Sequence, residues 1–199
     1  MGMDGGRRTE ASVSRRITAP AAEIFRVLAV PANHPALDGS GMLRASHDER
    51  VLGRVGETFT MAMYLPALGD YLMLNRVIAF EQDRRISWEP TPGDAVASQN
   101  AELPIGASQG YSWGFQLQPD GETTIVTEIF DCTEAASSIR DAVQDGQAWV
   151  QAMHGTLERL AALAELMQSR TPPGLETASA GTWHPGASQS LKDEELGDG

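Results

Sequence analysis

The sequence predicts an α+β fold in which one antiparallel β-sheet packs against a single long helix at its C-terminal end. Two observations support this prediction. Between residues 11 and 131, most segments alternate polar and apolar side chains with a period of two, which is typical of half-buried strands. After residue 134 the apolar period changes to 3.6, and residues 147–167 carry one apolar stripe, as an amphipathic helix does. Because turns join successive strands directly, the sheet must be antiparallel, and only that sheet is available to bury the stripe of the helix.

One strand and two short helical segments precede the rest of the predicted sheet. Residues 12–18 alternate apolar and polar side chains, which predicts the first strand. A short helix follows, because Pro20 suits the first helical position and Glu23 lies near the positive end of the helix dipole. This helix must end before Pro31, and a second helical turn is expected over residues 31–37.

Residues 33–44, NHPALDGSGMLR, contain the three residue types of a hydrolytic triad, His34, Asp38 and Ser40. Triad partners usually converge from distant parts of a fold, and a nucleophilic serine usually sits in a G-x-S-x-G elbow, which this segment lacks. Asp38 followed by glycine is instead typical of a turn. We therefore interpret the segment as a corner that leads from the short helices into a strand over about residues 42–50.

Five further segments have the period or composition of strands, and they are residues 57–65, 71–80, 84–90, 111–117 and 123–131. A Pro-Asp-Gly turn at residues 119–121 joins the last two segments as a hairpin. Residues 137–146 form either one short helix or an irregular segment before the long helix, which is expected to begin after Gly146.

Composition limits the kinds of partner that this chain can have. The chain has 199 residues and a formal net charge of −12, which disfavours binding to nucleic acids and to anionic membrane surfaces. Cys132 is the only cysteine, so we expect neither a disulfide framework nor a cysteine-rich zinc site. There is no apolar run long enough to span a membrane and no signal-peptide h-region, which predicts a cytoplasmic protein.

We expect one folded domain over residues 11–169, flanked by a disordered N-terminus at residues 1–10 and a disordered acidic tail at residues 170–199. The four histidines do not have metal-ligand spacing, and the N-terminal glycines neither follow a strand nor open a helix. We therefore predict that the protein binds no metal and no cofactor. We expect the protein to be a monomer or a homodimer.

Five motifs in this order resemble the START-like, SRPBCC superfamily, in particular its polyketide cyclase/dehydrase-like branch, over about residues 12–167. The motifs are RRITAPAAEIFRVLAVPANHPALDGSG, GETFTMAM, YLMLNRVIAFEQDRRISWEP, YSWGFQL and TIVTEIFDCT. The resemblance implies a helix-grip (START/Bet-v-1-like) fold: a curved antiparallel sheet of six to seven strands wrapped around a long C-terminal helix, with two short helices after the first strand. It also implies a cavity between sheet and helix. It implies no single activity, because the superfamily includes lipid carriers, cyclases and dioxygenase subunits.

The alternation of the strands and the stripe of the helix predict which side chains line this cavity. Methionine and aromatic walls suit an irregular apolar ligand, although the same side chains would also suit a filled core. The predicted lining residues are Phe59, Met61, Met63, Tyr71, Met73, Asn75, Trp88, Trp113, Phe115, Trp149, Val150 and Met153.

Asn75 and Glu128 are polar residues at inward positions of apolar strands, so each should find a hydrogen-bond partner, in the protein or in a ligand. An inward carboxylate with a raised pKa is also a candidate general base, and His154 beside the helical stripe is a second acid–base candidate. Residues 91–110 lack periodicity and are interpreted either as a lid over the cavity or as a segment without a role.

The leading functional hypothesis is the binding or carriage of a small hydrophobic or amphipathic molecule that is lipid-, polyketide- or isoprenoid-like. The first alternative is a polyketide cyclase or dehydratase that uses Glu128, His154 or Tyr71 for acid–base chemistry. The second alternative is a co-chaperone-like interaction module without a small ligand.

Overall fold

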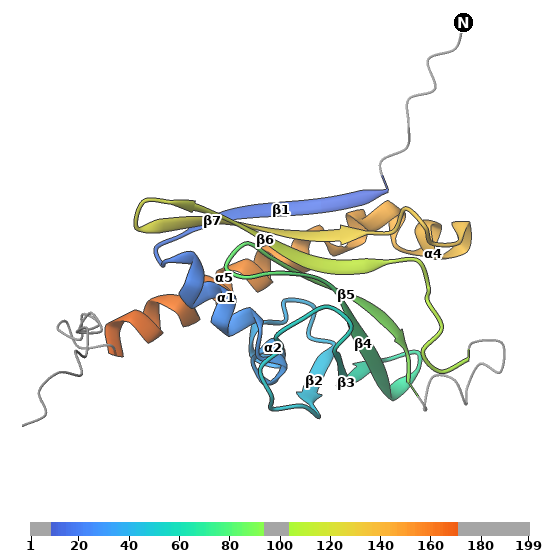
Figure 1. Cartoon of the computed structure of the whole chain (residues 1–199). Helices are drawn as coiled ribbons and strands as arrows, with labels where there is room; N and C mark the ends of the chain where they lie inside the picture. Colours follow the sequence, from blue (N-terminus) through green and yellow to red (C-terminus); the bar gives the residue numbers. More distant parts are fainter. Residues whose placement is uncertain (1–8, 94–103, 171–199) are drawn as a thin grey trace, which may run out of the picture.

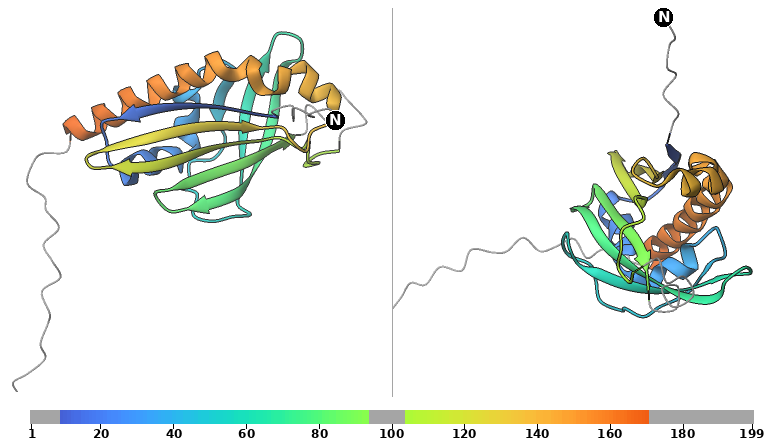
Figure 2. Two further views of the ribbon diagram at one scale, coloured as in Figure 1. Left: turned by 90° about the horizontal axis from the view of Figure 1, so that it is seen from above. Right: turned by 90° about the vertical axis from the view of Figure 1, so that its right-hand side faces the viewer.

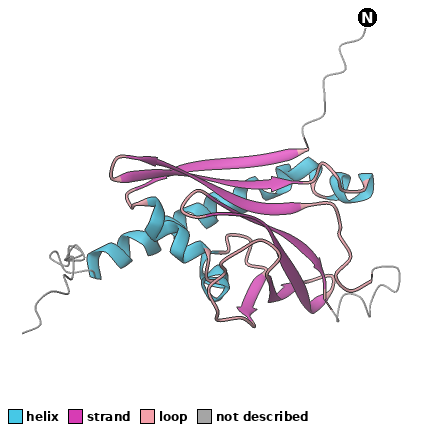
Figure 3. Cartoon of the chain, in the orientation of Figure 1, coloured by secondary structure: helices cyan, strands magenta, loops and turns pink. Residues whose placement is uncertain are grey.

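A computed structural model describes residues 9–93 and 104–170 of the chain. These residues form one seven-stranded sheet in the order β1-β7-β6-β5-β4-β3-β2, and all neighbouring strands are antiparallel. The sheet packs against the long helix α5 (Figure 1; Figure 3). The predicted α+β fold, with six to seven antiparallel strands and a long C-terminal helix, is confirmed.

The strands are β1 (Glu10–Ile17), β2 (Leu43–Ser46), β3 (Thr58–Leu65), β4 (Gly69–Glu81), β5 (Arg85–Pro92), β6 (Ser112–Asp120) and β7 (Thr123–Asp131). The helices are α1 (Ala21–Leu28), the 3₁₀ turn η1 (Pro31–Asn33), α2 (His34–Leu37), α4 (Ser137–Ala142), the 3₁₀ segment η2 (Gln144–Trp149) and α5 (Val150–Arg170). The two short helices expected after the first strand are therefore α1 and α2.

The sheet curves around α5, and Figure 2 shows this curvature in its right-hand view. Two register shifts, between Leu43 and Ala45 in β2 and between Val77 and Ala79 in β4, interrupt the regular pairing. Such irregularities bend a strand and increase its local twist. In the left-hand view α5 runs beside β1, so the helix lies on the inner side of the curved sheet.

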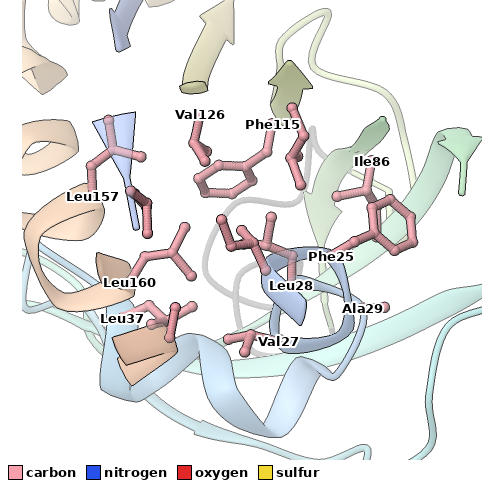
Figure 4. Packing of buried hydrophobic residues seen from close by; sticks show 14 of the residues in the cluster. Phe25, Val27, Leu28, Ala29, Leu37, Ile86, Phe115, Val126, Leu157 and Leu160 are labelled. Carbon is pink, nitrogen blue, oxygen red and sulfur yellow. The ribbon is translucent and has the colours of Figure 1, made fainter. Parts of the chain in front are cut away.

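The inner side of the sheet is filled at one end only. Figure 4 shows side chains from α1, α5 and the sheet in mutual contact there, including Phe25, Leu28, Phe115, Val126, Leu157 and Leu160. Phe25, Leu28 and Leu160 are at most 1% exposed. This solid core uses the C-terminal half of the stripe on α5, so the N-terminal half of that helix faces a different environment.

The segment at residues 38–40 is a corner, as the sequence predicts, and it is fastened to α5. Oδ1 of Asp38 accepts hydrogen bonds from the backbone N–H and the hydroxyl of Ser40, at 2.9 and 2.7 Å. The backbone N–H of Gly39 donates to Oγ1 of Thr156 at 3.1 Å. A Cβ atom on Gly39 would lie 1.9 Å from the carbonyl oxygen of Ala152, so only glycine allows this approach.

Several element boundaries differ from the prediction. The long helix begins at Val150 and not directly after Gly146, because Asp145 and Gly146 have φ angles of 51° and 92° and residues 144–149 form η2. Strand β2 ends at Ser46, where the hydroxyl of Ser46 bonds the backbone of Asp48 and turns the chain.

The first strand begins before the predicted domain start at residue 11. Glu10 already belongs to β1, and the carbonyl oxygen of Thr9 accepts a hydrogen bond from the N–H of Cys132 at 2.9 Å. Residues 1–8 and 171–199 lie outside the described residues. So do residues 94–103, half of the segment 91–110 that was interpreted as a lid or as a segment without a role, while Thr91 and Pro92 belong to β5.

Candidate ligand-binding cavity

A cavity of about 420 Å³ lies between the sheet and the N-terminal half of α5. Its lining combines residues of β3, β4, β5, β6 and β7 with residues of α2, η2 and α5. The volume is in the range of sites that hold drug-sized ligands. Close packing of Trp113, Met63 and Met153 against one another would have closed this space. All three residues border the cavity instead.

The period of two in β3 and β4 gives the cavity its methionine-rich wall. The two strands pair in a register that places Phe59 opposite Asn75, Met61 opposite Met73, and Met63 opposite Tyr71. Opposite residues in an antiparallel pair point to the same face, and every second residue of each strand shares that face. All six side chains line the cavity.

Aromatic rings from four elements form the second wall. The ring centroid of Trp113 in β6 lies 4.7 Å from that of Phe130 in β7 and 5.8 Å from that of Trp149 in η2. The ring of Trp88 in β5 lies 6.0 Å from that of Phe115. These rings offer large, flat apolar contact surfaces to a ligand.

Of the predicted lining residues, all except Val150 border the cavity. Val150, at the start of α5, is partly buried and packs against other buried hydrophobic residues. Of the three acid–base candidates, Tyr71 and Glu128 line the cavity, and burial raises the pKa of the Tyr71 hydroxyl. His154 is exposed on α5 and is not a lining residue, so the expectation that it points into the cavity is not met.

Glu128 is the most perturbed acid in the lining. It is 5% exposed, and its Oε2 atom has no hydrogen-bond partner among residues 9–93 and 104–170, so of the two kinds of partner expected, protein or ligand, the described protein residues supply none. Burial, and to a lesser extent the negative charge of Asp38, raises the pKa of this carboxyl from 4.5 to about 8. The side chain is therefore protonated at neutral pH and can both donate and accept a hydrogen bond.

His34 is a lining residue that the sequence analysis considered only as part of a triad or of a metal site. Its ring stacks on Trp88 with centroids 5.0 Å apart and an interplanar angle of 21°. Its Nε2 atom lies 2.8 Å from the carbonyl oxygen of Leu28, so Nε2 must donate. Burial lowers the pKa of the imidazole to about 4, which keeps the ring neutral at neutral pH.

The position of His34 also excludes the triad. Its Nε2 atom is bonded to the backbone of α1, while Asp38 bonds Ser40 directly. A nucleophilic serine would instead need an imidazole as its base. No sequence signal identified His34 as a cavity residue, because the single helical turn of α2 is too short to show a period.

The remaining polar lining residues have different partners. The amide nitrogen of Asn75 donates to the carbonyl oxygens of Phe59 at 3.4 Å and Met73 at 3.3 Å, so this side chain stabilises the sheet. The indole N–H of Trp149 is buried and has no partner among the described residues. Within the same part of the chain, no group of three or more His, Cys, Asp or Glu side chains is arranged to hold a metal ion. None of the described helices is long and apolar enough to span a membrane.

Comparison by sequence finds uncharacterized relatives. No family model matches the chain. The uncharacterized protein Rv0088 from Mycobacterium tuberculosis is 31% identical over 134 residues, which are 67% of this chain and 51% of that protein. The uncharacterized protein MT0096 from another strain of the same organism matches with the same identity and coverage. The chain thus spans about half the length of the curated relatives it matches.

Solved structures share the fold at low sequence identity. Protein Ms6760 from Mycobacterium smegmatis has a TM-score of 0.58 at 14% identity, covering 80% of this chain and 93% of that one. Protein CV1439 from Chromobacterium violaceum has a TM-score of 0.57 at 19% identity, covering 79% and 97%. An AHSA1-like protein from Aeromonas hydrophila has a TM-score of 0.52 at 17% identity, covering 82% and 96%. At these identities the likenesses show the fold alone, which is a helix-grip fold.

Proposed function

We propose that the protein binds and carries a small hydrophobic or amphipathic molecule, lipid-, polyketide- or isoprenoid-like, in the cavity between the sheet and α5. The observation that carries the proposal is the cavity of about 420 Å³ with its methionine and aromatic walls. Protein interiors are close-packed, and most voids in them are no larger than a water molecule. A hollow of this size beside a solid core therefore favours a ligand site over incomplete packing.

The test is the uptake of N-phenyl-1-naphthylamine, a neutral apolar dye whose fluorescence rises on transfer from water to an apolar site. The full chain should bind it with a saturable signal. Native mass spectrometry of the purified protein should also detect a co-purified apolar molecule. If the dye does not bind and repeated preparations carry no such molecule, the proposal is wrong.

A matched pair of substitutions separates the cavity from the outer surface of the sheet. Met63→Trp adds bulk to a lining residue of β3 and should abolish dye uptake. Ile78→Trp adds an indole at a residue of β4 that is 44% exposed, and uptake should remain. Circular dichroism and melting temperature establish that both variants are folded. Equal uptake by the two variants would place the dye outside the cavity.

A second candidate function is acid catalysis in the same cavity, of the kind a polyketide cyclase or dehydratase uses. The protonated Glu128 supports it, because a buried acid with a pKa of about 8 can donate a proton to a carbonyl or hydroxyl oxygen at neutral pH. Turnover of a β-polyketone substrate by the wild type, abolished in Glu128→Gln without a loss of thermal stability, would support it. Turnover that persists in this variant would exclude Glu128 as the acid.

A further inference from the structure

The apolar cavity has one end where polar atoms are buried without partners. Of the lining residues, two have such atoms when partners are sought among the described residues: Oε2 of Glu128 and Nε1 of Trp149. Buried polar atoms in folded proteins are nearly always hydrogen-bonded. Two exceptions in the wall of one cavity indicate that a bound molecule supplies the missing partner.

The two residues both line the cavity and both neighbour Phe130. Glu128 and Phe130 are two residues apart on β7, so their side chains leave the same face of the sheet. The ring of Phe130 lies 6.3 Å from that of Trp149, and both rings pack against Trp113. Glu128 and Trp149 are thus both neighbours of Phe130, Glu128 along β7 and Trp149 through its ring.

The charges around this end constrain the ligand. None of the lining residues in the described part of the chain is lysine or arginine, and the imidazole of His34 is neutral. Asp38 brings a negative charge close enough to affect Glu128. The titratable residues that border the cavity are His34, Asp38, Tyr71, Tyr111 and Glu128. The guanidinium of Arg159 donates to the carbonyl oxygen of Asp38 but does not line the cavity, so an anionic ligand would lie near the Asp38 carboxylate with no cation in the described cavity wall to balance it.

We propose that Glu128 and Trp149 form a recognition point for an uncharged oxygen acceptor, a carbonyl or hydroxyl oxygen, and that the cavity disfavours free carboxylates. This inference rests on the proposed function and adds the chemistry of the ligand's polar end. An uncharged oxygen of the ligand can accept a hydrogen bond from the O–H of a protonated Glu128 or from the N–H of Trp149. A protonated amine has no acceptor to offer the indole, which is a donor only.

The experiment uses four probes that share one isoprenoid chain and differ in the terminal group: farnesene, farnesol, methyl farnesoate and farnesoic acid. Each probe competes with N-phenyl-1-naphthylamine for the full-length protein at neutral pH. Farnesol and methyl farnesoate should bind about tenfold more tightly than farnesene, the free-energy equivalent of one or two net hydrogen bonds. Ionised farnesoic acid should bind more weakly than farnesol. A cavity without this recognition point would instead prefer farnesene, the most apolar of the four.

Three variants test whether the preference for farnesol over farnesene depends on the carboxyl of Glu128 and the N–H of Trp149. Trp149→Phe keeps an aromatic ring but removes the N–H, and Glu128→Leu removes the carboxyl. Each should reduce the preference for farnesol over farnesene severalfold and leave the affinity for farnesene within about twofold. Trp88→Phe is the matched control, because Trp88 lines the cavity but its N–H is not a buried unpartnered group. It should change all four affinities alike.

The outcomes separate this inference from the proposed function. If the dye binds and the four probes show no preference for farnesol, or if farnesoic acid binds as tightly as farnesol, the recognition point is wrong and the apolar ligand site stands. The recognition point is also wrong if the preference is unchanged in both Trp149→Phe and Glu128→Leu. If neither the dye nor any probe binds, both proposals are wrong.

Discussion

Replacing Glu128 by glutamine should change how the stability of the protein depends on pH. In the folded protein the pKa of this carboxyl is raised from 4.5 to about 8, chiefly by burial. Between these two pH values the folded state holds a proton that the unfolded state has released. The free energy of unfolding therefore falls as pH rises through this interval, by about 1.4 kcal/mol per pH unit. Over the whole interval the loss is about 5 kcal/mol, and above pH 8 it does not grow further.

Glutamine has the same shape and no charge at any of these pH values. Below pH 4.5, Glu128→Gln and the wild type should have similar stabilities, and the variant should become progressively more stable than the wild type toward pH 8. Urea unfolding at a series of pH values, followed by tryptophan fluorescence, gives both free energies. Glu122→Gln, which neutralises an exposed carboxyl in the turn between β6 and β7, is the control and should parallel the wild type. If the Glu128→Gln curve also parallels the wild type, the carboxyl is ionised in the folded state and our account of the cavity is wrong.

Three further changes test other parts of the structure. As pH falls from 6.5 to about 4, the wild type should lose about 3 kcal/mol of its free energy of unfolding, because in this range only the unfolded imidazole of His34 binds a proton. His34→Gln should not show this loss, and circular dichroism during an acid titration measures the difference. Gly39→Ala should destabilise by about 1–3 kcal/mol or more, because its Cβ would meet the carbonyl oxygen of Ala152, whereas Gly53→Ala, with open space around it, should be nearly neutral in the same urea assay. Leu160→Ala should lower the free energy of unfolding by about 2–5 kcal/mol through the cavity it leaves in the solid core, and a smaller loss would mean that the core collapses around it.

The fold follows from the sequence where a local period coincides with a tertiary environment. Strand β3 alternates because one of its faces meets the interior, and the register with β4 places equivalent residues opposite each other. The period of two in β3 therefore also predicts that Phe59, Met61 and Met63 lie on one face, which forms part of the cavity wall. The same period predicts that Glu128 is an inward residue of β7, where it shares a face with Val126 and Phe130.

Where the chain departs from a regular period, less of the structure can be predicted from it. The helix α5 was expected three residues too early, because the stripe of a helix does not reveal the positive φ angles at Asp145 and Gly146 that separate η2 from it. His34 lies in a helical turn of four residues, so no pattern shows which way it points. Its place beside Trp88 depends on how α2 packs into the curved sheet, which is a long-range property of the fold.

Burial in the cavity wall controls the charge of both His34 and Glu128. Removal from water disfavours the charged form of any group, so it lowers the pKa of the imidazole to about 4 and raises that of the carboxyl to about 8. Both groups are consequently neutral between these values, although one is a base and the other an acid. The carboxylate of Asp38 lies at the polar edge of the corner, where it accepts hydrogen bonds from the backbone N–H groups of Ser40 and Leu43. An interior that neutralises its own acid and base at neutral pH is suited to an uncharged ligand, because such a ligand adds no charge that the cavity would have to solvate.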